Sequence, residues 1–132
     1  MEALAVVIEK PERLTLSRLP ISPAGDGDVI VDIDYSGIST GTERLLWSGR
    51  MPPFPGMGYP LVPGYESVGR VVDVGCNVDL EPGQVVFVPG ANCFGEVRGL
   101  FGGAASRLVV PARRVAPIAA DFGEEAVLLA LA

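Results

Sequence analysis

The chain of 132 residues contains no histidine, and its only lysine is Lys10. The lack of histidine excludes zinc sites built on imidazole and nucleophile pairs of the Ser/His or Cys/His kind. A P-loop is excluded as well, because it needs a lysine at the end of a glycine-rich loop. The nearest approach to a dinucleotide fingerprint is Gly56-Met57-Gly58, but Leu61 stands in place of the third glycine and no strand precedes it. We therefore expect no cofactor-binding residues in this chain.

Basic charge and long apolar runs are also scarce. Ten basic residues against sixteen acidic ones give a net charge of −6, which would repel a phosphate backbone, so we expect no nucleic-acid partner. Proline and glycine interrupt the longest uncharged stretches, and the first ten residues do not resemble a signal peptide. We expect a cytoplasmic protein without a membrane segment. Its two cysteines, Cys76 and Cys93, should then be reduced thiols, and two thiols cannot form a four-ligand structural zinc site.

Valine occurs in short runs separated by the 17 glycines and 12 prolines, which is typical of a mainly β domain. In the segment 28–35 the residues Val29, Val31, Ile33 and Tyr35 alternate with polar ones and should share one face. Short strands with turns between them favour a small closed barrel over an open sheet. The strands that we predict cover residues 4–8, 14–16, 28–35, 67–74, 84–88 and 106–110.

Two helices are predicted beside the strands. The first runs from about residue 40 to residue 47, with Thr40 or Thr42 as its N-cap and Glu43 as a charge in its first turn. The second covers 124–132, begins with acidic residues and is otherwise apolar. It reaches the last residue without a C-cap glycine or a basic last turn. We therefore expect the chain to be cut from a longer protein.

Three blocks in this order resemble motifs of the medium-chain alcohol dehydrogenases. They are SGISTGTE at 36–43, PGYESVG at 63–69 and GGAASRLVVP at 102–111. They are similar to the family's GIC-GTD, PGHE-x-x-G and GG-x-A-E-x-x-x-V-P motifs. The resemblance implies that residues 1–122 form a GroES-like catalytic domain. It also implies that residues 123–132 begin the helix leading to a nucleotide-binding Rossmann domain absent from this chain, in a homo-oligomeric full-length protein.

Longer stretches, 36–72 and 95–112, resemble one branch of that family more closely. Its members use NAD to oxidise the 3-(1-hydroxyethyl) group of a (bacterio)chlorophyllide to a 3-acetyl group during bacteriochlorophyll a synthesis. The resemblance implies a tetrapyrrole substrate and NAD bound mainly by the missing domain, so this chain alone should be inactive. A zinc-free quinone or enoyl reductase domain and a non-catalytic tetrapyrrole-binding module are the alternatives.

The zinc members of the family bind their catalytic metal through a cysteine in the first block and a histidine in the second. This sequence offers Ser39 or Thr40 at the first position and Tyr65 at the second. Hydroxyl groups without a thiolate or an imidazole make a poor zinc site. We therefore expect catalysis without a metal.

Oxidation of an alcohol without zinc requires a side chain or water chain to take the hydroxyl proton. Thr42 matches the family's relay hydroxyl, and shifting the one-residue insertion would give Ser39 or Thr40 that part. Because a free tyrosine hydroxyl stays protonated at neutral pH, Tyr65 should act as a hydrogen-bond donor and relay rather than as a base. Glu66 is a further candidate catalytic residue, because its charge, if ionised beside Tyr65, would make Tyr65 keep its proton more strongly. The structural alternatives are helix caps for the threonines, a half-buried aromatic for Tyr65, and for Glu66 a bond to the backbone or to Arg70.

The segment 47–61 is apolar, yet it is too rich in proline and glycine to be a strand or a helix. It is either a loop packed over the barrel or against another domain, or a wall for a flat macrocycle. The wall residues would be Trp47, Met51, Phe54, Met57 and Tyr59. Arg44 or Arg50 could then pair with a propionate of the ring.

Overall fold

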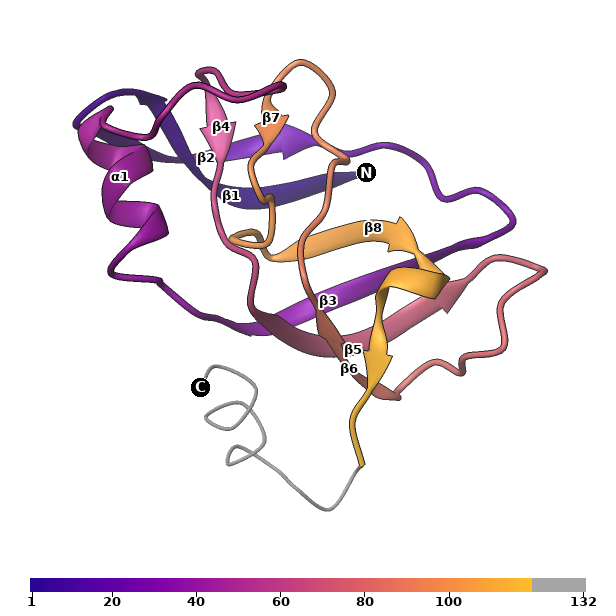
Figure 1. Ribbon diagram of the computed structural model, residues 1–132. Coiled ribbons are helices and arrows are strands. Elements are labelled where there is room, and N and C mark those ends of the chain that lie inside the picture. Colours follow the sequence, from indigo (N-terminus) through magenta and orange to yellow (C-terminus); the bar gives the residue numbers. More distant parts are fainter. Residues whose placement is uncertain (120–132) are drawn as a thin grey trace.

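Two β-sheets form the framework of residues 1–119, the part of the chain that this computed structural model describes (Figure 1). The first sheet has the order β2-β1-β4-β7 and consists of β1 (Glu2–Lys10), β2 (Arg13–Pro20), β4 (Leu61–Val62) and β7 (Arg98–Gly99). The second has the order β8-β3-β5-β6-β9 and consists of β3 (Asp28–Ser36), β5 (Ser67–Val74), β6 (Val85–Val88), β8 (Arg107–Pro111) and β9 (Ala116–Pro117). Neighbouring strands are antiparallel except β4 and β7, which are parallel.

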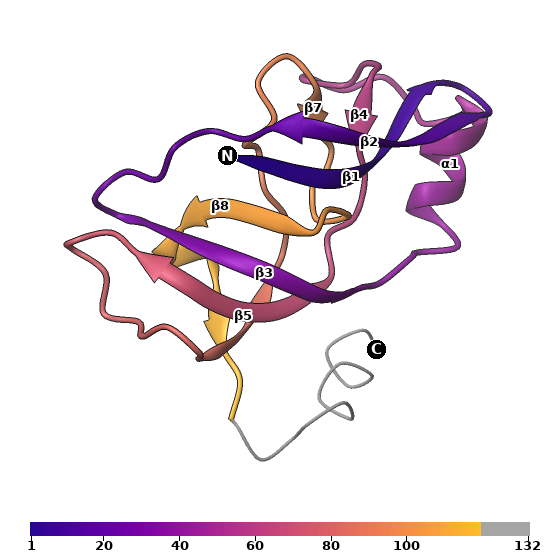
Figure 2. The same ribbon diagram turned by 180° about the vertical axis from the view of Figure 1, so that it is seen from behind.

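The two sheets join along β1 and the residues just before β8. Ala5 forms an isolated bridge with Ala105, and the N–H of Val6 donates to the carbonyl of Ala104 at 2.9 Å. Figures 1 and 2 show β8 between β1 and β3, so it connects the sheets on that side. The strands thereby curve around one apolar core, and the predicted mainly β, barrel-like fold is confirmed.

The core follows from alternation along the strands. Ala3, Ala5 and Val7 of β1 are buried in it, and Val29 and Val31 of β3 are completely inaccessible to solvent. The expectation that Tyr35 continues this buried face is wrong, since it is 45% exposed. A register shift between Ile33 and Tyr35 places an extra residue in β3, and such a bulge interrupts the alternation.

The six predicted strands are all present, and the prediction for 67–74 has the observed bounds. The sequence pattern did not reveal β4, β7 and β9, which have two residues each, or the 3-10 helix at Ala112–Arg114. Two residues are too few to show a period, so these elements are defined only by the strands they pair with.

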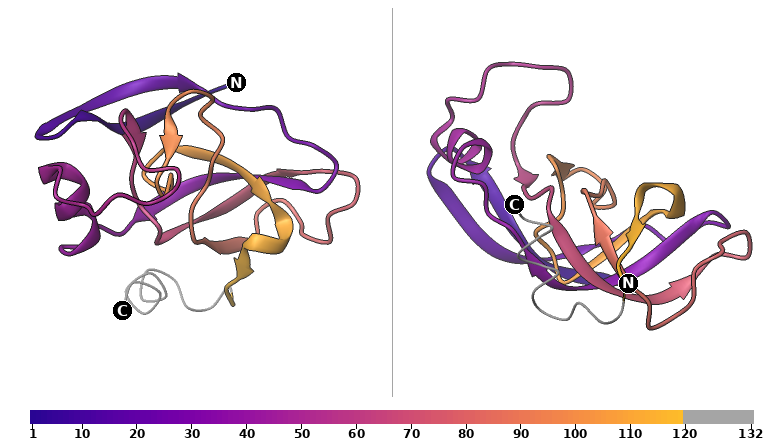
Figure 3. Two further views of the ribbon diagram at one scale, coloured as in Figure 1. Left: turned by 45° about the horizontal axis from the view of Figure 1, so that its top comes forward. Right: turned by 60° about the horizontal axis from the view of Figure 1, so that its bottom comes forward.

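Helix α1 (Thr42–Ser48) lies at one end of the molecule, and a long loop leads from it to β4 (Figure 3). The threonine caps predicted for it are wrong. Its N-cap is Gly41, which has no side chain of its own to cap the helix, while Thr42 is already its first helical residue. The helix ends at Gly49, whose φ of 78° lets its N–H bond to the carbonyl of Leu45. The second predicted helix, 124–132, and the proposed boundary at 122/123 lie outside the described residues.

No helix among residues 1–119 is both long and apolar enough to cross a bilayer. Both cysteines are free, as expected, but their surroundings differ. Cys93 is 2% exposed and fills space within the core cluster as a small apolar side chain, and burial raises the pKa of its thiol.

The two thiols should therefore react at very different rates. Cys76 is exposed, so a disulfide reagent should label one thiol per chain within minutes under native conditions. Labelling of Cys93 should require denaturant. Mass spectrometry of the labelled peptides checks this, and rapid native labelling of Cys93 would contradict the buried position.

Candidate active site

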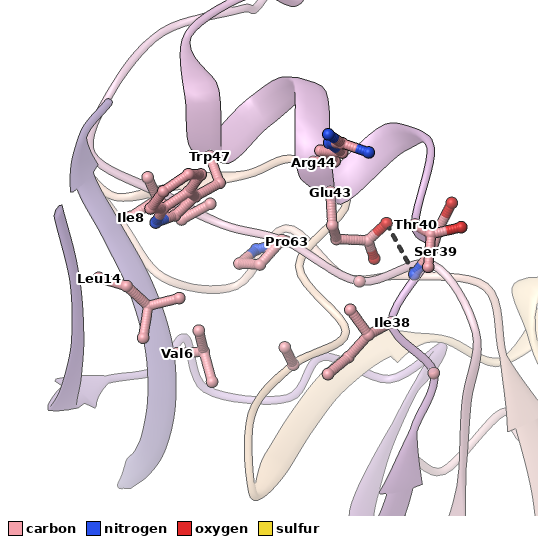
Figure 4. A pocket seen from close by; sticks show the side chains of 13 residues that line it. Val6, Ile8, Leu14, Ile38, Ser39, Thr40, Glu43, Arg44, Trp47 and Pro63 are labelled. Carbon is pink, nitrogen blue, oxygen red and sulfur yellow. Dashed lines mark hydrogen bonds between the residues drawn. The ribbon is translucent and has the colours of Figure 1, made fainter. Parts of the chain in front are cut away.

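A cavity of about 430 Å³ lies between α1, the β1–β2 hairpin and three loop segments (Figure 4). We call it the α1 cavity. Its lining residues come from six parts of the chain and are mostly apolar. They are Val6, Ile8, Leu14, Gly37, Ile38, Ser39, Thr40, Glu43, Arg44, Trp47, Pro63, Gly64 and Ala104.

The apolar part of the α1 cavity is the outer face of the hairpin together with one side of the helix. Val6 and Ile8 of β1 face away from the core, and Leu14 of β2 is the register partner of Ile8. Trp47 covers this face from α1, as Figure 4 shows. Leu14 and Trp47 are still 53% and 42% exposed, so their side chains can contact a ligand without first leaving a packed core.

The polar end of the α1 cavity is a turn held by two side chains. The hydroxyl of Ser39 accepts N–H bonds from Gly41 and Thr42 at 3.3 and 3.1 Å. In return, the carboxylate of Glu43 accepts the N–H of Ser39 at 3.1 Å. These bonds resemble a capping box and fix the turn that presents Ser39 and Thr40 to the cavity. The side chain of Ser39, rather than that of Thr40 or Thr42, therefore accepts the free backbone N–H groups at the start of α1.

Glu43 is the buried carboxylate of this site. It is 9% exposed, and Figure 4 shows its carboxylate between the apolar side chains and the Ser39–Thr40 turn. Burial raises the pKa of Glu43 above its ordinary value of 4.5, and the charge of Glu66 adds to that rise. Hydrogen bonds from the backbone N–H groups of Glu43 and Ser39 oppose it without cancelling it.

The floor of the α1 cavity joins the second and third sequence blocks. The N–H groups of Gly103 and Ala104 donate to the carbonyls of Gly64 and Pro63 at 2.7 and 2.9 Å. A side chain at Gly64, where φ is 99°, would collide with the backbone of Ala104. The fully buried Ser67 donates to the carbonyl of Gly103 at 2.9 Å. The glycines of both blocks are therefore needed for this close approach of two backbones.

The structure brings part of the predicted site together. Ser39, Thr40, Arg44 and Trp47 line the α1 cavity, whereas Thr42, Tyr65 and Glu66 do not. The ring of Tyr65 instead packs edge-on against Phe101, with centroids 5.3 Å apart. Arg70, considered as a partner for Glu66, lies 3.7 Å from the carboxylate of Asp34. The catalytic parts assigned to Thr42, Tyr65 and Glu66 stay predictions.

The predicted wall residues beyond Trp47 lie outside the α1 cavity. Met51, Met57 and Tyr59 pack against a small cluster formed by Ile8, Leu46 and Leu61, and the hydroxyl of Tyr59 donates to the carbonyl of Leu46. Phe54 and Arg50 are exposed on the same loop. Substrate contacts by these five residues stay predictions.

Among the cavity-lining residues that sequence reasoning missed are Val6, Ile8, Leu14, Ile38 and Glu43. Glu43 was predicted only as a charge in the first turn of the helix. Its position in the block SGISTGTE, next to the predicted site residues, could have indicated that it belongs to the site. The four apolar residues carry no local signal, because the sequence does not show which face of a strand a distant helix will cover.

The donor groups near the α1 cavity do not fit the zinc site of the family. The positions of its cysteine and histidine hold Ser39 or Thr40 and Tyr65, which offer hydroxyls. Within residues 1–119, no three His, Cys, Asp or Glu side chains gather in a metal-binding group. We derive no step through zinc.

The two joined sheets, with a ligand-sized cavity at one end, define a GroES-like barrel. Residues 25–120 match the alcohol dehydrogenase GroES-like domain family, and the chain belongs to it. It is 55% and 50% identical, over its whole length, to the 2-desacetyl-2-hydroxyethyl bacteriochlorophyllide A dehydrogenases of Rhodobacter capsulatus and Cereibacter sphaeroides. It spans 42% and 43% of these relatives.

Solved structures agree on the fold. One is the short chain alcohol dehydrogenase of Escherichia coli CFT073, complexed with NADH. The superposition has a TM-score of 0.77 at 24% identity, and it covers 97% of this chain and 42% of the dehydrogenase chain.

Proposed function

We propose that this chain is the substrate-side domain of an NAD-dependent dehydrogenase acting on a bacteriochlorophyllide. The enzyme oxidises the ring hydroxyethyl group (position 3 in the notation used above, position 2 in the relatives' names) to an acetyl group, in bacteriochlorophyll a synthesis. The observation that supports this is the overall identity of 55% and 50%, over the whole length of the chain, with two dehydrogenases of that name.

The α1 cavity is suited to one edge of such a substrate. Its volume of about 430 Å³ falls within the usual range for small-molecule sites, and its lining is apolar except at the Ser39–Glu43 end. A flat apolar ring can lie against Trp47 and the hairpin, with its hydroxyethyl group toward the polar end. Arg44, at the rim, carries the charge that a ring propionate would need.

The reaction separates a hydride from a proton. NAD, when bound, supplies the hydride acceptor, and the residues of this domain bind the ring and receive the hydroxyl proton. We propose that they do so without zinc, because the donor set described above is unsuited to it. Activity of the purified enzyme should then persist after dialysis against a chelator.

The test uses a protein of the relatives' length that contains this domain. It is mixed with a 3-(1-hydroxyethyl) bacteriochlorophyllide and NAD without added metal, and the pigment's absorption is followed. A red shift from the new conjugated acetyl group supports the proposal. Pigment binding without a shift would instead indicate a carrier. If the pigment neither binds nor shifts, the alternative of a quinone or enoyl reductase is favoured.

A further inference from the structure

The α1 cavity has two ionisable residues in its lining, Glu43 and Arg44, and they are placed differently. Arg44 is exposed at the rim, whereas Glu43 is buried. A buried carboxylate costs free energy unless its charge is compensated. The backbone N–H groups of Ser39, which donates to Oε2, and of Glu43 itself compensate this charge only in part, and Glu66 adds a like charge nearby. A carboxylate with only a structural role would be poorly placed here, because its negative charge is not fully compensated. The same surroundings suit a carboxylate whose role is to take up a proton.

The position of Glu43 also suits a proton acceptor better than the hydroxyls of the site. Thr42 and Tyr65 do not line the α1 cavity, while Ser39 uses its oxygen to accept two backbone N–H groups. A serine or threonine hydroxyl can pass a proton on, but it cannot keep one at neutral pH. A carboxylate can keep the proton that it accepts, and a raised affinity for that proton makes it a better base.

Resting on the proposed function, we infer that Glu43 is the general base of the reaction. Its carboxylate takes the proton of the substrate's secondary hydroxyl as the hydride leaves the same carbon for the nicotinamide. The O–H and C–H bonds break, the C=O bond of the acetyl group forms, and Glu43 becomes a neutral acid. It returns the proton to solvent at the open end of the cavity, beside the exposed Thr40.

Glu43→Gln in the complete enzyme is the first test. The amide oxygen of glutamine can still accept the N–H of Ser39, so the fold should be kept while the base is lost. We expect kcat to fall about 100-fold or more, with pigment affinity within about threefold of the wild-type value. Glu96→Gln, a matched change at an exposed position, should leave kcat unchanged. A loss of less than about tenfold in Glu43→Gln would overturn the assignment.

Chemical rescue separates a base from a structural residue. Glu43→Ala leaves room for formate, and added formate should raise its turnover at least about tenfold in proportion to concentration, with no effect on Glu96→Gln. A folded, pigment-binding Glu43→Ala enzyme that formate does not rescue would mean that Glu43 only positions Ser39, and would overturn the proposal. If the wild-type enzyme itself binds pigment without turnover, the proposed function fails first and the role of Glu43 falls with it.

Discussion

Gly69→Ala is expected to destabilise the domain by roughly 3 kcal/mol, which for a chain of this size lowers the melting temperature by about 10 °C. Gly69 lies in β5 opposite Ile33, next to the bulge in β3, and it is buried. A methyl group there would overlap the backbone carbonyl of Asp32. Because that carbonyl belongs to β3, which pairs with β8 on one side and β5 on the other, it cannot move without disturbing the pairing on both sides.

The matched control is Gly27→Ala. Gly27 is exposed in the turn before β3, and a methyl group there would meet no atom within 4 Å. The free energy of unfolding of Gly27→Ala should stay within about 0.5 kcal/mol of that of the unchanged chain. Denaturant unfolding of the 132-residue chain, followed by circular dichroism, measures both variants. Equal stability of the two would show that the β3–β5 contact at the bulge is looser than described.

Trp47→Ala is expected to weaken binding of the bacteriochlorophyllide by about 30-fold, because removal of a central tryptophan from a binding site typically costs about 2 kcal/mol. Trp47 is the largest apolar side chain that lines the α1 cavity and lies over Ile8 and Leu14 (Figure 4). Titration of the complete enzyme with pigment, followed by the pigment's absorption, gives the affinity.

Phe54→Ala is the comparison for this measurement. Phe54 is 37% exposed, close to the 42% of Trp47, but it does not line the cavity. A macrocycle in the α1 cavity should lose much more affinity with Trp47→Ala than with Phe54→Ala. Similar losses in both variants would favour the wider wall along residues 47–61, and no loss in either would place the pigment elsewhere.

The sequence predicted those parts of the fold that depend on local periodicity. Short valine-containing runs between glycines and prolines, with clear alternation in β3, were sufficient to locate β1, β3, β5 and β8, and the three blocks indicated the barrel they belong to. Tyr35 was misplaced because a bulge leaves no mark in an alternating pattern. The caps of α1 were misassigned because Ser39 reaches over the turn at residues 40–41 and satisfies the groups that a threonine was expected to satisfy.

The candidate site was predicted only in part, for a different physical reason. Ser39, Thr40, Arg44 and Trp47 stand close together in sequence, so a local motif was enough to single them out. Val6, Leu14 and Ile38 become part of the cavity only because α1 docks beside the hairpin. Glu43 likewise shares the cavity with Pro63 and Gly64, which stand at least 20 residues further along the chain. Tertiary packing of this kind is not encoded in any one window of the sequence.

The way in which the α1 cavity is assembled has a consequence for the protein's synthesis. Its floor includes Ala104, held by backbone bonds to Pro63 and Val6. While the chain is still on the ribosome, the hairpin and α1 can emerge early, yet the cavity stays incomplete until the residues around Ala104 have also emerged. A growing chain therefore offers no finished pocket to a ligand. The complete α1 cavity exists only after most of this domain has been translated.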